Sequence, residues 1–295
     1  MKTGMRLSLV VAVSGFAASI AWAGQAEQFQ MTILRDLEYV PSGHARQKLD
    51  LYLPNEVGPR VKWPLLVWIH GGAWLSGSKE RPAALSFVAK GYAVASINYR
   101  LSQHAIFPAQ IEDCKAAIRW LRAGAGKYGY DPNHIGVWGA SAGGHLVALL
   151  GATGDVTEFD VGPNAGVSSR VQAVCDFFGP TDFTKMSSFP STMQHDAADS
   201  PESKLIGGPV QQNKDKVQRA NPILYVTKDD PPFLIVHGDK DPLVPHNQSE
   251  ILLDALKKAG VEATLYTVAG GGHGGFKDPQ VDVLLTEFFQ KHLRK

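Results

Sequence analysis

Short apolar runs recur along the chain, and most of them end in a loop rich in glycine, histidine or aspartate. The run 63–69 is almost continuously apolar, which predicts a strand buried on both faces. Similar runs predict strands at 93–99, 135–140, 171–178, 232–236 and 263–268. Helical periodicity between the runs predicts helices at 83–90, 108–122, 142–150, 247–259 and 281–292. This alternation predicts an α/β fold with a mostly parallel central sheet, helices on both faces and a site along the carboxyl ends of the strands.

Three other segments refine this outline. Residues 31–40 and 47–53 predict an antiparallel pair of strands joined by a Pro-Ser-Gly turn, and Asp131-Pro132-Asn133 predicts a turn before the strand at 135–140. From about 183 to 225 the periodicity fades into Ser, Pro, Asp, Gln and Lys, which indicates a short lid-like insertion with short helices. We therefore expect one domain over 24–295 that contains this insertion.

The first 23 residues have the pattern of a secretory signal peptide. Lys2 and Arg6 precede an apolar run, 7–20, and Ala21-Trp22-Ala23 supplies a small-residue cleavage site. A buried N-terminal helix or a membrane anchor is the alternative, but the run is short and rich in Gly, Ser and Ala. The pattern predicts removal of 1–23, export to the periplasm or the medium, and no stable membrane anchor.

Composition narrows the classes of function. The chain has 295 residues, 44% of them hydrophobic and 19% charged, and a formal charge of +1. It has no basic stripe, so its charge gives no indication of nucleic-acid binding. Its two cysteines, Cys114 and Cys175, fall in a helical and an apolar strand pattern and read as small buried side chains. A disulfide between them stays open in an oxidising compartment.

The stretch 135–145 joins an apolar run, a turn of small residues and the start of a helix. Its pattern Gly139-x-Ser141-x-Gly143 is that of a nucleophile elbow, in which a sharp strand-to-helix turn exposes the serine hydroxyl. The turn excludes bulky neighbours because strand and helix approach closely there. An ordinary glycine-rich turn is the alternative, so the serine needs partners elsewhere in the chain.

The candidate partners, an acid and then a histidine, follow the serine in the chain, and each of the three residues comes after a predicted strand. Acyl transfer by serine needs a base for its proton and a carboxylate that orients the base. His273, in the glycine-rich loop 270–275, is the candidate base, and Asp241 is the candidate acid. Asp239 in the same loop is the alternative acid, although its position favours a turn-forming role. Other histidines are weaker candidates for the catalytic base. His145 is expected in the core and His70 is expected to support its loop, while His104, His195 and His246 lie in polar segments without an evident partner.

The loop after the strand at 63–69 reads His70-Gly71-Gly72-Ala73-Trp74. Its glycines let backbone amides approach a ligand, so the amides of Gly72 and Ala73, with that of Ala142, are the candidate oxyanion hole. Trp74 lines the acyl pocket or packs the loop, and the sequence does not decide between them. These residues imply no metal ion and no organic cofactor.

Several motifs together resemble a family. Besides the two loops above, they are Asn98-Tyr99-Arg100-Leu101, Phe107-Pro108, Asp131-Pro132, Phe177-Phe178-Gly179-Pro180-Thr181-Asp182 and His237-Gly238-Asp239-x-Asp241-x-x-Val244-Pro245. With them the chain resembles a secreted α/β-hydrolase esterase, close to the bacterial group of bifunctional feruloyl and acetylxylan esterases and more distantly to hormone-sensitive-lipase-like carboxylesterases. Ala73 stands where the lipase-like relatives have a third glycine, and no large N-terminal cap is evident, which argues against lipid substrates.

The resemblance implies hydrolysis of carboxylic esters, with acetyl or feruloyl esters of plant polysaccharide as the expected substrates. The alternatives are a general short-chain carboxylesterase or lipase, an aryl-formamidase, and a hydrolase-fold binding protein without activity. The substrate is then a small-molecule or a polysaccharide-linked ester. The oligomeric state is open.

Overall fold

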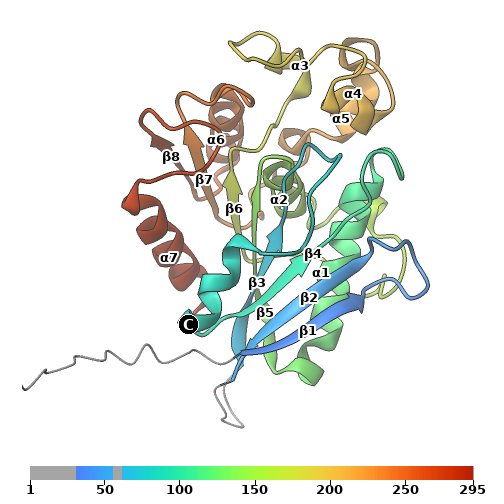
Figure 1. Cartoon of the computed structure of the whole chain (residues 1–295), viewed down its shortest axis with the longest axis vertical. Coiled ribbons are helices and arrows are strands. Elements are labelled where there is room, and N and C mark those ends of the chain that lie inside the picture. The colour runs from blue at the N-terminus through green and yellow to red at the C-terminus, as the bar shows by residue number, and fades with distance from the viewer. Residues whose placement is uncertain (1–30, 56–61, 295) are drawn as a thin grey trace, which may run out of the picture.

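The computed structural model describes residues 31–55 and 62–294, so the predicted signal peptide, 1–23, lies outside the described residues. Within them eight strands form one sheet in the order β1-β2-β4-β3-β5-β6-β7-β8 (Figure 1). The strands are β1 (Met31–Glu38), β2 (Lys48–Pro54), β3 (Trp63–Ile69), β4 (Ala93–Ile97), β5 (Tyr130–Ala140), β6 (Ala173–Phe177), β7 (Phe233–Gly238) and β8 (Ala263–Val268). The pairs β1–β2 and β2–β4 are antiparallel and the others parallel, which confirms the predicted mostly parallel sheet.

Helices cover both faces of the sheet. The longer ones are η1 (Ala83–Lys90, a 3-10 helix), α1 (Ala109–Tyr128), α2 (Ala142–Ala152), α6 (Asn247–Ala259) and α7 (Pro279–Leu293). Side chains of α1, α2 and α6 join one apolar core, whereas those of η1 and α7 join a second core. Strand β3 feeds both, because Leu65 and Val67 face the first core and Leu66 the second. The continuous apolar run of this strand thus follows from burial on both faces.

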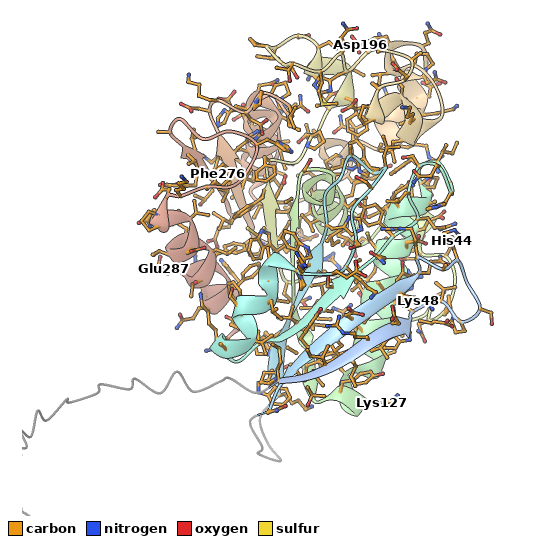
Figure 2. The ribbon with its side chains drawn as sticks, viewed as in Figure 1. His44, Lys48, Lys127, Asp196, Phe276 and Glu287 are labelled. Atoms are coloured by element: carbon orange, nitrogen blue, oxygen red, sulfur yellow. The ribbon has the colours of Figure 1, made fainter. Side chains whose placement is uncertain are left out.

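The shorter helices lie in the segment after β6. They are α3 (Phe183–Met186), α4 (Pro201–Ile206), η3 (Val210–Gln212), α5 (Lys214–Arg219) and η4 (Pro222–Tyr225); one more, η2 (Thr157–Phe159), follows α2. Figure 1 shows α3, α4 and α5 together at one end of the molecule. Figure 2 shows Asp196 there, far in the view from Lys48 on β2 and Lys127 on α1.

Two local predictions need correction. The residues of the expected turn, Asp131-Pro132-Asn133, belong to β5, where the pairing with β3 is irregular between Trp63 and Leu65. The Asp131 carboxylate still accepts a hydrogen bond from the Asn133 amide at 2.8 Å, so a local bend persists inside the strand. Helix α1 continues past the predicted end at 122 to Tyr128, because its backbone reaches a left-handed C-cap only at Gly129, φ 85°.

The parallel strands bring their carboxyl ends to one edge. In β5 the last residue, Ala140, pairs with Phe177 of β6, and Phe177 pairs with Val236 of β7. The loops that follow β3, β5, β7 and β8 hold the candidate residues of the sequence analysis. Topology therefore gathers loops that lie more than 100 residues apart in the chain, from Gly72 to His273.

Candidate active site

Ser141 lies at the sharp turn between β5 and α2. Its backbone has φ 56° and ψ −123°, a strained conformation for a residue with a side chain. A Cβ on Gly143 would lie 2.1 Å from the Ile69 carbonyl oxygen, and one on Gly139 would lie 2.2 Å from the Gly143 carbonyl oxygen. Small residues flank the serine because strand and helix touch there.

The structure brings Ser141, His273 and Asp241 into one hydrogen-bonded chain. His273 Nε2 lies 3.0 Å from Ser141 Oγ, and His273 Nδ1 lies 2.7 Å from Asp241 Oδ2. With Nδ1 donating to the carboxylate, Nε2 carries the lone pair that faces the serine hydroxyl. The arrangement can therefore remove a proton from Ser141 Oγ.

Asp241, rather than Asp239, contacts the histidine. The Asp241 carboxylate is buried, and its Oδ1 accepts hydrogen bonds from the amides of Leu243 (2.8 Å) and Val244 (3.0 Å). Asp239 is exposed and accepts from the Gly270 amide at 2.7 Å, so it braces the turn that precedes His273. Of the two carboxylates that the sequence left open, Asp241 is the one that contacts His273.

His237 is a partner of Asp241 that the sequence analysis did not identify. Its Nε2 lies 3.2 Å from Asp241 Oδ2 and 3.0 Å from the Val244 carbonyl oxygen, and its Nδ1 lies 2.7 Å from Ser249 Oγ. Burial, the largest influence on Asp241, acts to raise its pKa, but hydrogen bonds from His237 and His273 outweigh it and hold that pKa well below its usual range. Asp241 is thus ionised throughout the neutral range. The signal that could have identified His237 is its position at the end of a buried strand, directly before the acid loop.

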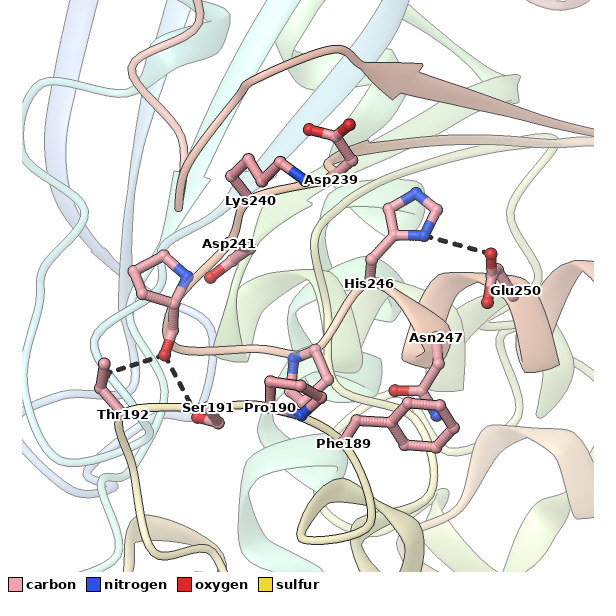
Figure 3. A pocket seen from close by; sticks show the side chains of 12 residues that line it. Phe189, Pro190, Ser191, Thr192, Asp239, Lys240, Asp241, His246, Asn247 and Glu250 are labelled. Atoms are coloured by element: carbon pink, nitrogen blue, oxygen red, sulfur yellow. Dashed lines mark hydrogen bonds and ion pairs between the residues drawn. The ribbon is translucent and has the colours of Figure 1, made fainter.

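Segment 191–192 is hydrogen-bonded to the same acid loop from the other side. Thr192 donates to the Pro242 carbonyl oxygen from its amide at 2.8 Å and from its hydroxyl at 2.9 Å. Ser191 Oγ lies 3.2 Å from the same oxygen (Figure 3). These groups form one wall of an outer cavity of about 630 Å³, which Asp239 and Lys240 also line. The acid loop is therefore held from both sides.

The loop after β3 lies beside Ser141. Gly72, Ala73 and Trp74 all have positive φ, at 105°, 54° and 56°. The Gly72 carbonyl oxygen accepts from the amides of Leu75 and Ser76, which closes the loop. Among the described residues, the amides of Gly72 and Ala73 donate to no backbone oxygen. Both residues line a cavity together with Ser141 and Ala142, as an oxyanion hole requires.

His70 lies behind this loop, as the sequence suggested. Its ring stacks on Tyr99 with 4.5 Å between ring centroids, and its Nδ1 lies 2.7 Å from the Gly71 carbonyl oxygen. Burial lowers the pKa of His70 to about 4, so the ring is neutral at pH 7. Its contacts are with the loop backbone and Arg46 rather than with Ser141.

The cavity around Ser141 has a volume of about 540 Å³ and a mostly apolar lining. Trp74 borders it but is only 1% exposed, because its ring packs edge-on against His145 and Phe183. Loop packing therefore accounts for the Trp74 side chain, and almost none of its surface faces the cavity. Phe178, which the sequence analysis did not single out, lies with its ring centroid 4.7 Å from that of His273. Met193, His195, Pro201, Glu202, Leu243 and Val244 line the cavity as well.

The other histidines have partners that sequence did not reveal. His195 is buried, with Nδ1 3.0 Å from Glu202 Oε1. His145 is buried in the core, as predicted; its Nε2 lies 2.7 Å from the Ala220 carbonyl oxygen, and burial lowers its pKa to about 4. His246 faces Glu250, and His104 packs against His44.

Three further observations concern the rest of the described chain. Cys114 and Cys175 are buried in cores on opposite faces of the sheet and form no disulfide, since the sheet lies between them. Within 31–55 and 62–294, no group of three His, Cys, Asp or Glu side chains is arranged to hold a metal ion. Over the same residues, none of the helices has the length and apolar character needed to span a membrane.

Comparison with known proteins identifies relatives of this architecture. Superposition on a truncated form of a carbohydrate esterase from gut microbiota gives a TM-score of 0.83 at 38% identity, covering 92% of this chain and 99% of that one. For a bifunctional GH43-CE protein of Bacteroides eggerthii the TM-score is 0.80 at 39% identity, covering 88% of this chain and 38% of that one. These likenesses confirm the predicted α/β-hydrolase fold.

Curated sequences agree. Esterase LipQ of Mycobacterium tuberculosis is 32% identical over 245 residues, which are 82% of this chain and 56% of LipQ. Esterase LipC of the same organism is 34% identical over 232 residues, which are 77% of this chain and 57% of LipC. The chain thus spans a little over half the length of these relatives. The model of the BD-FAE family matches residues 49–256, a range that contains the serine elbow and the acid loop. On that match, the chain belongs to the BD-FAE family of α/β-hydrolases.

Proposed function

We propose that the protein hydrolyses carboxylic esters through an acyl-serine intermediate. Ser141 Oγ attacks the ester carbonyl carbon while His273 Nε2 takes its proton, and the C–O bond then breaks as His273 returns the proton to the leaving alcohol. Water next attacks the acyl group, again with His273 as base, and releases the acid and free Ser141. The hydrogen-bonded chain from Ser141 through His273 to Asp241 is the observation that carries this proposal.

Two further elements complete the mechanism. The ionised Asp241 holds His273 in the tautomer that donates from Nδ1 and stabilises the imidazolium that forms during proton transfer. The amides of Gly72, Ala73 and Ala142 bind the oxyanion, and the N-terminus of α2 adds a favourable partial positive charge. Loss of one such donor typically costs about 3 kcal/mol in the transition state.

We propose acetyl or feruloyl esters of plant polysaccharide as the substrates. Support comes from the family match and from two structural relatives, one called a carbohydrate esterase and one a GH43-CE protein. Phe178 would then form an apolar wall for the acyl group, and Trp74 would support the loop beside it. Residues 183–225 act as a short cap over the carboxyl ends of the strands within a single domain, 24–295.

A general short-chain carboxylesterase is the second candidate. The mostly apolar lining of the 540 Å³ cavity suits a small acyl group without any sugar. The curated relatives LipQ and LipC are called esterases, and neither name mentions a carbohydrate. In both cases we propose an exported protein whose first 23 residues are removed.

The decisive experiment uses Ser141→Ala. The purified variant should lose turnover of 4-nitrophenyl acetate and labelling by a fluorophosphonate probe, since both depend on the same hydroxyl. Full activity in this variant would end the proposal. Rates of the wild type on acetylated xylan, methyl ferulate, 4-nitrophenyl butyrate and N-formylkynurenine then separate the polysaccharide, short-chain and formamidase possibilities.

A further inference from the structure

Glu202 is a buried carboxylate on the wall of the cavity that contains Ser141. It belongs to helix α4 in the insertion and is 3% exposed. Its Oε1 lies 3.0 Å from His195 Nδ1, whereas its Oε2 is buried and hydrogen-bonds to no described protein atom. Half of this carboxylate therefore has no protein donor, and a ligand in the cavity reaches it only if the side chain turns toward the cavity.

The surroundings of His195 keep Oε2 available as an acceptor. His195 Nε2 lies 3.1 Å from the Leu243 carbonyl oxygen and 3.1 Å from Ser191 Oγ. An imidazolium donates to both Leu243 and Glu202, and a neutral ring protonated at Nδ1 donates to Glu202 and accepts from Ser191. In both forms Oε1 takes the histidine proton and Oε2 keeps its lone pairs.

His195 also fixes Glu202 relative to the reacting groups. Leu243, which faces His195 through its carbonyl oxygen, donates its own amide to Asp241 at 2.8 Å. The insertion and the acid loop thus share one residue, and Glu202 is connected to Asp241 through a short series of hydrogen bonds. A binding group needs such support to be held in place before the ligand arrives.

A buried acceptor without a partner is costly, typically about 1–3 kcal/mol, and a ligand that supplies a proton removes that cost. Apart from the His195–Glu202 pair, this side of the cavity is apolar, with Met193, Pro201, Leu243 and Val244. A neutral hydroxyl is the donor that fits, because it brings no charge into an apolar wall. We propose that Glu202 Oε2 accepts a hydrogen bond from a hydroxyl group of the ester substrate, so that the insertion selects hydroxylated esters.

This inference rests on the proposed ester hydrolysis and adds the chemistry of the substrate. The hydroxyl comes either from the acyl part, as in a hydroxycinnamoyl group, or from the alcohol part, as in a sugar. Matched pairs of esters that differ only by hydroxyl or methoxy distinguish these sources. Methyl ferulate and methyl 3,4-dimethoxycinnamate test the acyl side, and 2-hydroxyethyl acetate and 2-methoxyethyl acetate test the alcohol side.

In the wild type, kcat/KM should favour the hydroxyl member of one pair by about tenfold or more, since a site built to bind a hydroxyl discriminates strongly against its absence. Glu202→Gln keeps the shape, and with its carbonyl oxygen facing His195 it places an amide group, a donor, at the position of Oε2. The hydroxyl-to-methoxy ratio should therefore fall by about tenfold, the loss of one hydrogen bond to a charged group. The matched control is Glu250→Gln, an exposed glutamate outside this cavity, which should leave the ratio as in the wild type.

Two results overturn the inference: a wild-type ratio near one for both pairs, or a ratio that Glu202→Gln does not change. The first is measured without any variant, so misfolding cannot obscure it, and melting curves of Glu202→Gln guard the second. Failure of the ester hydrolysis itself looks different, because the wild type would then cleave neither member of either pair and Ser141 would resist fluorophosphonate.

Discussion

In the described part of the chain, two buried carboxylates that contact histidines, Asp241 and Glu202, differ in how many hydrogen bonds they accept. Asp241 accepts from two backbone amides on Oδ1, while His237 and His273 lie within 3.2 Å and 2.7 Å of Oδ2. Among the described residues, Glu202 has one hydrogen-bond partner, His195, and its buried Oε2 has none. Both oxygens of Asp241 already accept hydrogen bonds from the protein, whereas one oxygen of Glu202 accepts none.

This difference suits the two carboxylates to different roles, orienting a catalytic base and binding a substrate. A carboxylate that orients a catalytic base works best when its own position is fixed by many donors. A carboxylate that binds substrate must keep an acceptor free until the substrate supplies the proton. Asp241 follows a strand of the rigid sheet, whereas Glu202 comes from a short helix of the insertion. On the two proposals above, residues at the ends of the sheet strands carry out the chemistry, and the insertion selects the substrate.

The largest expected contrast is between His273→Ala and His195→Ala. Removal of His273 takes the base away from Ser141, and the loss in kcat for 4-nitrophenyl acetate should be about 10⁵- to 10⁶-fold. Removal of His195 leaves the three residues of the relay in place, so its loss in kcat should be far smaller. Equal losses would show that the two pairs act as one unit, contrary to the division of tasks. Steady-state kinetics on both variants, with circular dichroism to confirm folding, measure this.

The acid loop offers the next contrast. Asp241→Asn keeps the shape but favours the wrong histidine tautomer, so kcat should fall about 10⁴-fold. The matched control is Asp239→Asn in the same loop, where the side chain is exposed and hydrogen-bonds the Gly270 amide. Because the asparagine oxygen still accepts from that amide, the turn before His273 is kept and kcat should stay close to that of the wild type. A large loss in Asp239→Asn with activity retained in Asp241→Asn would reverse the assignment of the acid.

Much of the fold could be predicted because strand burial leaves a strong sequence pattern. The run 63–69 is apolar throughout since Leu65 and Leu66 face two different cores, and the predicted bounds match β3. The turn at 131–133 was predicted because Asp and Pro favour turns locally. These residues fall within the bounds of β5, but they lie between the pairs Trp63–Tyr130 and Leu65–Ile135, where they have no partner on β3 and the strand bulges.

The strand-end loops also made most of the site predictable. Ser141, Asp241 and His273 each follow a strand, so the order of the residues was enough to indicate that they meet. His195 and Glu202 were missed because no periodic pattern runs through 183–225, and the partners of a buried polar side chain there depend on how short helices pack. His237 was missed for another reason, since a histidine within a buried strand reads as part of the core.

Removing one member of the His195–Glu202 pair should lower the folding stability much more than removing both. In His195→Phe the Glu202 carboxylate stays buried without its partner, and breaking a buried pair in this way typically costs about 3–5 kcal/mol. The double variant His195→Phe/Glu202→Leu replaces both members by apolar groups and should recover most of that loss. Urea unfolding of the three proteins measures the recovery. If the double variant is as unstable as the single one, lost packing rather than an unpaired charge is the cause.

A third buried carboxylate, Asp176, has no histidine at all and so sharpens the comparison by its pH dependence. Within 31–55 and 62–294 the Gly179 amide is its one donor, at 2.9 Å, and burial, opposed by that hydrogen bond, raises the pKa of Asp176 to about 7. The pKa of Asp176 is higher in the folded protein than in the unfolded chain. The stability that follows from this difference is therefore fully present below pH 4 and is lost as the pH rises to 7. Asp176→Asn removes the titration, so its free energy of unfolding relative to the wild type should increase by about 2–3 kcal/mol between pH 5 and pH 8. Urea unfolding at both pH values gives this difference, and the titration of every other group cancels in the comparison. A difference that stays constant with pH would contradict this prediction. It would mean that Asp176 is ionised in the native protein and, like Asp241, accepts hydrogen bonds from more donors than the Gly179 amide.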